Sequence, residues 1–183
     1  MEIINTPIKD IVIVKPKIFE DNRGYFFESY NKKIFDQLIG KKVNFIQDNQ
    51  SKSSFGTLRG IHYQIPPASQ AKLVSVLYGE IYDVAVDLRR SSTTFCQYVG
   101  KNISADNKLQ MWIPEGFGHG FLTLSNYAIV SYKVNSSYSK IHERTIKYDD
   151  DLLNIQWPSS KNIILSDKDK NGISIKNSTD LFN

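Results

Sequence analysis

The stretch Gly79-Glu80-Ile81-Tyr82-Asp83-Val84-Ala85-Val86-Asp87-Leu88-Arg89 alternates polar and apolar residues. A period of two is typical of a half-buried antiparallel strand, because successive side chains point to opposite faces. A second strand pattern precedes it in Leu58-Arg59-Gly60-Ile61-His62-Tyr63-Gln64, which carries an imidazole close to a guanidinium. Imidazole titrates near neutral pH and a guanidinium binds anions, so this segment indicates proton chemistry on an anionic substrate within a β framework.

Similar short patterns recur along the chain, separated by turn signals such as Asp21-Asn22-Arg23-Gly24 and Pro114-Glu115-Gly116. Many short strands at regular spacing indicate an all-β sandwich or barrel. The predicted strands are 11–14, 25–30, 43–50, 58–63, 73–78, 80–88, 98–104, 110–113, 120–124, 129–134 and 163–166.

One short peripheral helix is predicted over 32–38. Asn31 precedes it as N-cap, and Ile34, Phe35 and Leu38 share one of its faces.

The length of 183 residues, 40% of them hydrophobic, fits one domain with a sizeable core. We expect the core to occupy about 10–166 and a tail to occupy 167–183, with the Asn-rich part after Gly172 frayed. Cys96 is the only cysteine, so packing and β pairing must hold the framework, and a reducing cytoplasm is the expected location. Residues 1–7 do not resemble an export signal, and no apolar run approaches the ~18 residues of a membrane helix, so no membrane partner is expected.

The net charge of +4 comes from lysines scattered over the chain, without a basic helix or an arginine cluster. This distribution argues against a nucleic-acid partner. It leaves open a small anionic ligand or a lysine-rich surface. Four cations lie beside turns or at polar strand positions, namely Arg23, Arg59, Lys72 and Lys168. They are candidates for binding phosphate or stabilising an enolate. The usual alternative is a charge that is simply solvated.

The chain has three histidines, and their spacing argues against a metal site. His62 is followed by Tyr63 and Gln64, so no His-x-His pair supplies two ligands from one strand, and His142 has no second histidine at helical spacing. Asp167 to Gly172 matches the start of a calcium loop, but Ser178 stands where its bidentate Glu should be, so we predict a charged surface turn. On residues alone a strand histidine is more often structural than catalytic, and His62 is the best catalytic candidate.

Eight motifs occur in a fixed order along the chain. They are Asp21-x-Arg23-Gly24-x-Phe26-x-Glu28, Gln47-Asp48-Asn49-Gln50-Ser51, Leu58 to Gln64, Lys72-Leu73-Val74, Asp83-Val84-x-Val86-Asp87-x-Arg89, Pro114-x-Gly116-x-x-His119-Gly120-Phe121, Trp157-Pro158 and Ser166-x-Lys168-Asp169. As a set they resemble the motifs of dTDP-4-dehydrorhamnose 3,5-epimerases, the cupin-type sugar-nucleotide epimerases of deoxysugar synthesis. The resemblance runs nearly from end to end.

The resemblance implies an all-β, cupin-type jelly-roll barrel with a few short peripheral helices and neither metal nor cofactor. It implies a dTDP-linked 4-keto-6-deoxyhexose as substrate, with dTDP-4-dehydro-6-deoxy-D-glucose inverted at C3 and C5 to give dTDP-4-dehydro-L-rhamnose. It also implies a homodimer that exchanges strands near the amino terminus, so that some residues of one site come from the neighbouring chain.

Roles for individual residues follow from the same resemblance. His62 would be the base, and Asp169 would orient it. This role replaces the earlier interpretation of Asp169 as part of a charged surface turn. Tyr132 would be the acid on the opposite face of the sugar, and Lys72 would stabilise the C4 oxygen. The implied substrate-binding residues are Arg23, Glu28, Gln47, Asn49, Arg59, His119, Tyr138, Glu143 and Lys168, with Tyr138 stacked on thymine and His119 supporting the Lys72 pocket.

Three alternatives stay open at this point. Relatives with the same core motifs invert C3 alone or act on other nucleotide-linked 4-ketosugars. A metal-dependent cupin enzyme is disfavoured by the ligand spacing. A non-catalytic sugar-nucleotide-binding cupin would bind dTDP without exchanging substrate hydrogens with solvent.

Overall fold

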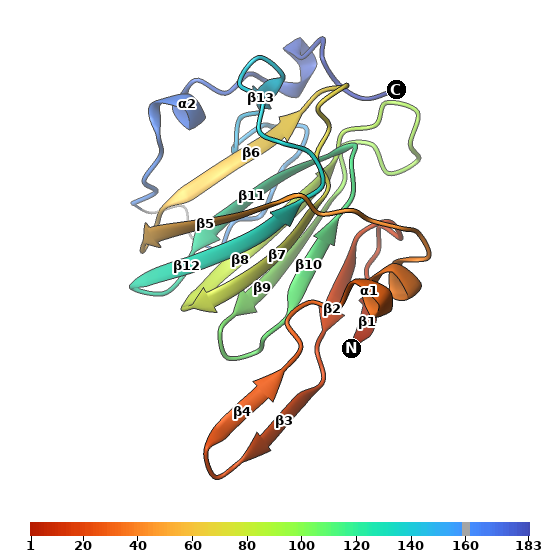
Figure 1. Cartoon of the computed structure of the whole chain (residues 1–183). Coiled ribbons are helices and arrows are strands. Elements are labelled where there is room, and N and C mark those ends of the chain that lie inside the picture. The colour runs from red at the N-terminus through yellow and green to blue at the C-terminus, as the bar shows by residue number, and fades with distance from the viewer. Residues whose placement is uncertain (159–161) are drawn as a thin grey trace.

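The computed structural model describes residues 1–158 and 162–183, and two antiparallel sheets form its body (Figure 1). The larger sheet consists, in spatial order, of β1 (Glu2–Asn5), β2 (Val12–Lys15), β10 (Gln110–Ile113), β7 (Lys72–Tyr78), β12 (Tyr127–Val134) and β5 (Gln47–Ser54). The smaller sheet consists of β13 (Glu143–Thr145), β6 (Leu58–Gln64), β11 (Phe117–Thr123), β8 (Glu80–Asp87) and β9 (Tyr98–Ser104). A separate hairpin, β3 (Ile18–Asp21) and β4 (Gly24–Phe27), projects from the body at the end away from β6 (Figure 1).

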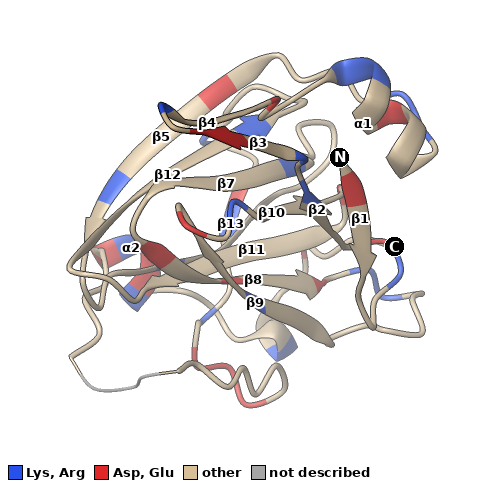
Figure 2. Cartoon of the chain, turned by 90° about the horizontal axis from the view of Figure 1, so that it is seen from below, with Lys and Arg blue, Asp and Glu red and all other residues tan. Residues whose placement is uncertain are grey.

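The two sheets stack as layers around an apolar core (Figure 2). Val74 and Val76 of β7 face Ile81 and Ala85 of β8 within this core, and all four are at most 7% exposed. A second buried cluster covers the opposite face of the smaller sheet. The smaller sheet is therefore covered on both faces.

The alternating stretch that begins at Gly79 forms β8, as predicted, but the expectation of a half-buried strand is wrong. Asp83 and Asp87, at polar positions of the pattern, are both 0% exposed. Both share a strand face with Ile81 and Ala85, which the larger sheet covers, while the second cluster covers the other face, where Val84 and Val86 lie.

Several predicted strand limits differ from the observed ones. The prediction over 25–30 is shortened to β4, because the chain leaves the hairpin after Phe27, and the prediction over 43–50 is shifted to β5. The prediction over 163–166 is wrong as a strand, since Ile164 makes only an isolated bridge with Thr57. The sequence patterns missed β1, β3 and β13, which are short, largely exposed or polar strands without an apolar alternation.

The helix predicted after Asn31 is confirmed as α1 (Lys32–Ile39), with the Asn31 side chain accepting the Ile34 amide hydrogen at 3.3 Å. The charged turn predicted at Asp167 is wrong, because α2 (Asp167–Lys170) forms there with Ser166 as N-cap. The Ser166 hydroxyl accepts the Asp169 amide hydrogen at 3.2 Å, which satisfies a donor that a helix start otherwise leaves unpaired. None of the helices in the described ranges is long and apolar enough to cross a membrane.

The tail after Gly172 packs against the smaller sheet, so the expectation that it frays is wrong. Ile175 in the short 3₁₀ helix η1 (Ile175–Asn177) is 3% exposed, and its amide donates to the buried Asp150 carboxylate at 2.8 Å. Further along, the Phe182 ring contacts Tyr63, with 5.8 Å between ring centroids. This packing fixes the segment that carries α2 against β6.

Lysine and arginine positions are spread over many elements of the fold, and acidic positions lie among them (Figure 2).

Candidate active site

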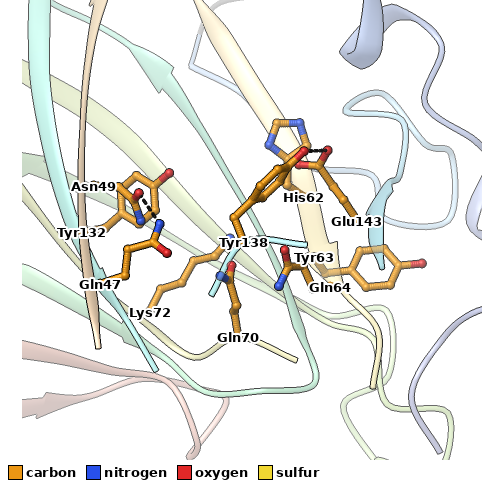
Figure 3. Close-up of a pocket in the computed structure, with 10 residues that line it drawn as sticks. All are labelled: Gln47, Asn49, His62, Tyr63, Gln64, Gln70, Lys72, Tyr132, Tyr138 and Glu143. Carbon is orange, nitrogen blue, oxygen red and sulfur yellow. Dashed lines mark hydrogen bonds between the residues drawn. The ribbon is translucent and has the colours of Figure 1, made fainter. Parts of the chain in front are cut away.

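A cavity of about 140 Å³ lies between the two sheets, and side chains from both sheets line it (Figure 3). Strands β5, β7 and β12 of the larger sheet face β6 and β13 of the smaller one across it. The lining residues are Gln47, Asn49, His62, Tyr63, Gln64, Gln70, Lys72, Tyr132, Tyr138 and Glu143.

His62 reaches the cavity from β6 and is held from behind by Asp169 of α2. The His62 Nε2 atom lies 2.5 Å from Asp169 Oδ1, and the carboxylate also accepts the Ser166 hydroxyl at 2.6 Å and the Gly60 amide at 3.3 Å. Asp169 is 3% exposed, so these donors replace water around a buried charge. Since Nε2–H donates to the carboxylate, the lone pair of neutral His62 is on Nδ1, the nitrogen available to a ligand.

The surroundings of His62 keep the imidazole neutral at physiological pH. Burial lowers its pKa below 6.5, while the hydrogen bond to Asp169 raises it in part, and the charges of Lys168 and Lys72 lower it further. For Asp169, burial raises the pKa, but the hydrogen bonds from His62 and Ser166 outweigh it and hold that pKa below its usual value. The pair at pH 7 is therefore a carboxylate beside a neutral imidazole, which is a general base.

Lys72 and Tyr132 enter the cavity from the larger sheet. Lys72 is 8% exposed, and burial lowers its pKa to about 8 against the opposing charge of Asp83. Burial also raises the pKa of the Tyr132 hydroxyl, so the phenol carries its proton at neutral pH. In Figure 3, Tyr132 and His62 lie on different sides of the cavity, with Lys72 between them in that view.

Three predicted binding residues join into one network at the cavity rim. Glu143 of β13 accepts the Lys168 ammonium at 2.8 Å and the Tyr138 hydroxyl at 3.2 Å. On the other side of the cavity, Gln47 donates its amide to Asn49 at 2.7 Å along β5. These groups are donors and acceptors on a polar rim around the inner cavity.

Five predicted binding residues lie outside the cavity lining, and one of them is Lys168, which reaches the rim through Glu143. Arg23 and Glu28 belong to the projecting hairpin segment, where the Arg23 guanidinium binds the Asp21 carboxylate at 2.6 Å. Arg59 is exposed on β6 and donates to the Ser53 hydroxyl at 3.0 Å. His119 lies on β11, directly opposite His62 in the sheet register, so both side chains project from the same face of the smaller sheet.

The family model described as dTDP-4-dehydrorhamnose 3,5-epimerase matches residues 5–177. The chain belongs to this family. It is 55% identical over 172 residues to the dTDP-4-dehydrorhamnose 3,5-epimerase of Shigella flexneri, which covers 94% of each chain.

Solved structures agree with this membership. The epimerase of Legionella pneumophila in complex with dTDP-4-keto-L-rhamnose has a TM-score of 0.93 and 47% identity, covering 96% of this chain and 93% of that one. A 3'-monoepimerase from Streptomyces bikiniensis in complex with dTDP-quinovose has a TM-score of 0.89 at 31% identity, covering 96% and 88%. The predicted family, the cupin-type jelly-roll fold and the epimerase activity on a sugar nucleotide are confirmed.

Sequence reasoning missed two glutamines of the epimerase's cavity, Gln64 and Gln70. Gln64 is 4% exposed, donates to the Ala68 and Ser137 carbonyls at 2.6 and 3.2 Å, and accepts the Ser139 amide at 2.7 Å. It thereby ties together the two loops that border the cavity. Its position two residues after His62 on the same strand face is the signal that identifies it as cavity-facing.

The described ranges of the epimerase contain no group of three or more His, Cys, Asp or Glu residues arranged to hold a metal ion.

Replacing Asp169 by Asn should lower the pKa of His62 further below 6.5. The hydrogen bond and the charge of Asp169 both raise that pKa in the wild type, so their loss leaves burial and the nearby lysines unopposed. A pH titration of the His62 ring by ¹H–¹⁵N NMR, assigned with H62Q, measures the change.

D167N is the matched control, because the Asp167 side chain on the same helix is 94% exposed. It should leave the His62 titration where it is. A His62 pKa that rises in D169N would contradict the dyad.

Proposed function

We propose that this epimerase converts dTDP-4-dehydro-6-deoxy-α-D-glucose to dTDP-4-dehydro-β-L-rhamnose, with His62 as the base at C3 and C5. The observation that carries the proposal is the His62–Asp169 hydrogen bond, which leaves Nδ1 of a neutral imidazole available at a cavity that also contains Lys72. The substrate assignment is supported by the relatives, which are dTDP-4-dehydrorhamnose 3,5-epimerases at up to 55% identity.

Each inversion begins with removal of a proton from a carbon next to the C4 ketone. His62 Nδ1 takes the proton, the C–H electron pair forms the carbon–carbon double bond of an enolate, and negative charge moves onto the C4 oxygen. The Lys72 ammonium stabilises that oxygen more strongly in the transition state than in the ketone, and this difference accelerates the step. Asp169 stabilises the imidazolium that forms.

Inversion is completed by a proton from the opposite face of the ring. Tyr132 is the proposed donor at C5, because burial keeps its hydroxyl protonated at neutral pH and it enters from the sheet that faces His62. The phenolate then regains a proton from solvent, and the imidazolium loses one to solvent. The cycle therefore exchanges substrate hydrogen with water.

The inner cavity is smaller than the ~300–1,000 Å³ that hold drug-sized ligands, so we assign it to the sugar ring. The nucleotide then lies along the rim. Tyr138 is the proposed stacking partner of thymine, and Arg59 and Lys168 are proposed for the diphosphate, because both side chains end beyond the cavity lining. Gln47, Asn49 and Glu143 are proposed for polar contacts, and His119 for support of the Lys72 pocket.

Arg23 and Glu28 need a second copy of the chain to take part. Their hairpin projects from the body, and its aromatic residues Phe19, Tyr25 and Phe26 are 52%, 59% and 67% exposed. Large exposed aromatic groups on a projecting hairpin are typical of an interaction surface. We propose a homodimer in which this hairpin brings Arg23 and Glu28 to the nucleotide in the partner's site.

Two broader proposals concern the whole chain. Residues 1–183 form a single epimerase domain, supported by a family match that extends to residue 177, beyond the predicted core. A cytoplasmic location is supported by the unpaired thiol of Cys96 within the described residues.

Inversion of C3 alone is the second candidate function, since the Streptomyces bikiniensis relative is a 3'-monoepimerase. The higher identity to the 3,5-epimerases favours inversion of both carbons. NMR analysis of the product formed in deuterated water separates the two, because deuterium at both C3 and C5 with inverted C5 is expected only from the 3,5-epimerase.

Replacing His62 by Ala should reduce solvent deuterium incorporation at C3 and C5 by ~100 to 10,000-fold, the usual contribution of a general base. NMR of the recovered nucleotide sugar measures it. H142A is the control, because His142 is bonded to the Ser139 hydroxyl at 2.7 Å and is not part of the cavity lining. Exchange in H62A at the wild-type rate would remove His62 from the mechanism, whereas a wild-type protein that binds dTDP without any exchange would be better described as a binding protein.

Replacing Tyr132 by Phe should slow C5 inversion by ~100-fold and deuterium exchange by far less, because only the second-face donor is lost. Product formation and exchange are followed in the same NMR sample. Y127F is a matched control on β12, since Tyr127 stacks on Tyr78 with 4.4 Å between ring centroids and lies outside the cavity lining. Equal losses in both rates would contradict the assignment.

A mixed dimer of R23A and H62A subunits should recover about half of the wild-type activity, because in a two-fold dimer one site then carries both defects and the other carries neither. Differently tagged subunits purified through both tags allow the measurement. If the two residues serve the same subunit's site, the mixed dimer will show no more activity than the mean of the two variant homodimers.

A further inference from the structure

Asp83 is a carboxylate placed inside the apolar core. It is 0% exposed and lies on β8 between Ile81 and Ala85, whose side chains belong to the core between the sheets. Since alternate strand residues share a face, the Asp83 side chain points into the same space. A buried carboxylate is costly unless other groups compensate it, so this position is not explained by packing alone.

Only one Asp83 oxygen has a hydrogen-bond partner. Oδ1 lies 2.7 Å from His119 Nε2, while the buried Oδ2 has no partner among the described residues. His119 is itself 6% exposed and lies opposite His62 in the register of β11 and β6. The pair therefore lies beside the proposed base, on the sheet face from which His62 also projects.

Lys72 reaches the same interior from the facing sheet. It shares its strand face with Val74 and Val76 of the core, and it is 8% exposed. The described salt bridges do not include a contact between Lys72 and Asp83, so the two charges interact through space within a poorly hydrated interior. After burial, Asp83 is the largest influence on the pKa of Lys72, and it raises that pKa.

The other charges around Lys72 largely cancel. Glu143 raises the pKa of Lys72 and Lys168 lowers it, and these two residues form an ion pair at 2.8 Å. Lys72 also lowers the pKa of His62, and the hydrogen bond between His62 and Asp169 acts against that lowering. Asp83 is thus the acid left to balance the lysine.

We propose that Asp83 is a positioning residue that acts through Lys72: its carboxylate, held by His119, keeps the buried ammonium charged so that it can stabilise the enolate oxygen. This inference rests on the proposed role of Lys72. It assigns His119 to holding the Asp83 carboxylate in the interior between the sheets.

The test is the dependence of kcat/KM on pH in the full-length enzyme. The wild type should lose activity above about pH 8, as Lys72 loses its proton. In D83N the alkaline limb should move to lower pH by roughly one unit, which is about a tenfold loss of kcat/KM along that limb. D83E, which keeps the charge, should restore the limb toward its wild-type position.

D87N is the matched control. Asp87 lies on the same strand, is also 0% exposed, and binds Arg89 at 2.7 Å instead of facing the cavity. It should lower thermal stability and leave the alkaline limb unchanged. An unchanged limb in D83N, with activity lost evenly at all pH values, would overturn the inference and leave Asp83 a structural residue.

K72M separates this inference from the proposed function. Its profile should lack the alkaline limb near pH 8. If K72M abolishes the limb and D83N does not move it, the inference alone fails, whereas a limb that persists in K72M overturns the role of Lys72 as well.

Should D83N fail to fold, the double variant D83N/K72M removes both charges. It should have a higher urea midpoint at pH 6 than D83N, because no uncompensated ammonium remains in the core. A double variant that is no more stable than D83N would overturn the inference.

Discussion

The hydrogen bond between His62 and Asp169 is the interaction on which the site depends, and it joins residues 107 positions apart in the sequence. It forms only when the C-terminal segment packs against the smaller sheet, where Ile175 and Phe182 are held against Ile61 and Tyr63. The tail is therefore part of the catalytic apparatus. Its packing fixes α2, α2 fixes the carboxylate, and the carboxylate fixes which nitrogen of His62 is available.

The cavity combines a neutral imidazole with a charged ammonium, although burial lowers the pKa of both. Their ordinary pKa values differ enough that the same desolvation leaves His62 unprotonated and Lys72 protonated at neutral pH. Asp169 limits the lowering of the His62 pKa, and Asp83 limits the lowering of the Lys72 pKa. Base and electrostatic stabiliser are thus set by environment, as in other sites where neighbouring groups titrate apart.

Sequence reasoning found the elements that have a strong local signal. The strand period identified β6, β8 and β12, and Asn31 identified α1, because these patterns depend on neighbouring residues. The signal for α2 was present in Ser166-Asp167-Lys168-Asp169, a serine cap followed three residues later by an acid, and the charged composition hid it. Burial of Asp83 had no local signal, because it depends on a facing sheet formed by distant parts of the chain.

Motifs could suggest individual site residues, but contacts between distant parts of the chain leave no local signal. The arrangement of those residues around the cavity therefore had to come from the fold. Inversion of a carbon needs a proton acceptor and a proton donor on opposite faces of one ring. A single strand places alternate side chains on one face, so it cannot supply both. Two facing sheets can, and here the proposed base His62 belongs to the smaller sheet, while the proposed donor Tyr132 and the cation Lys72 belong to the larger one. The sandwich is thus the simplest scaffold for this chemistry, since the gap between its layers becomes the space in which the sugar ring is enclosed.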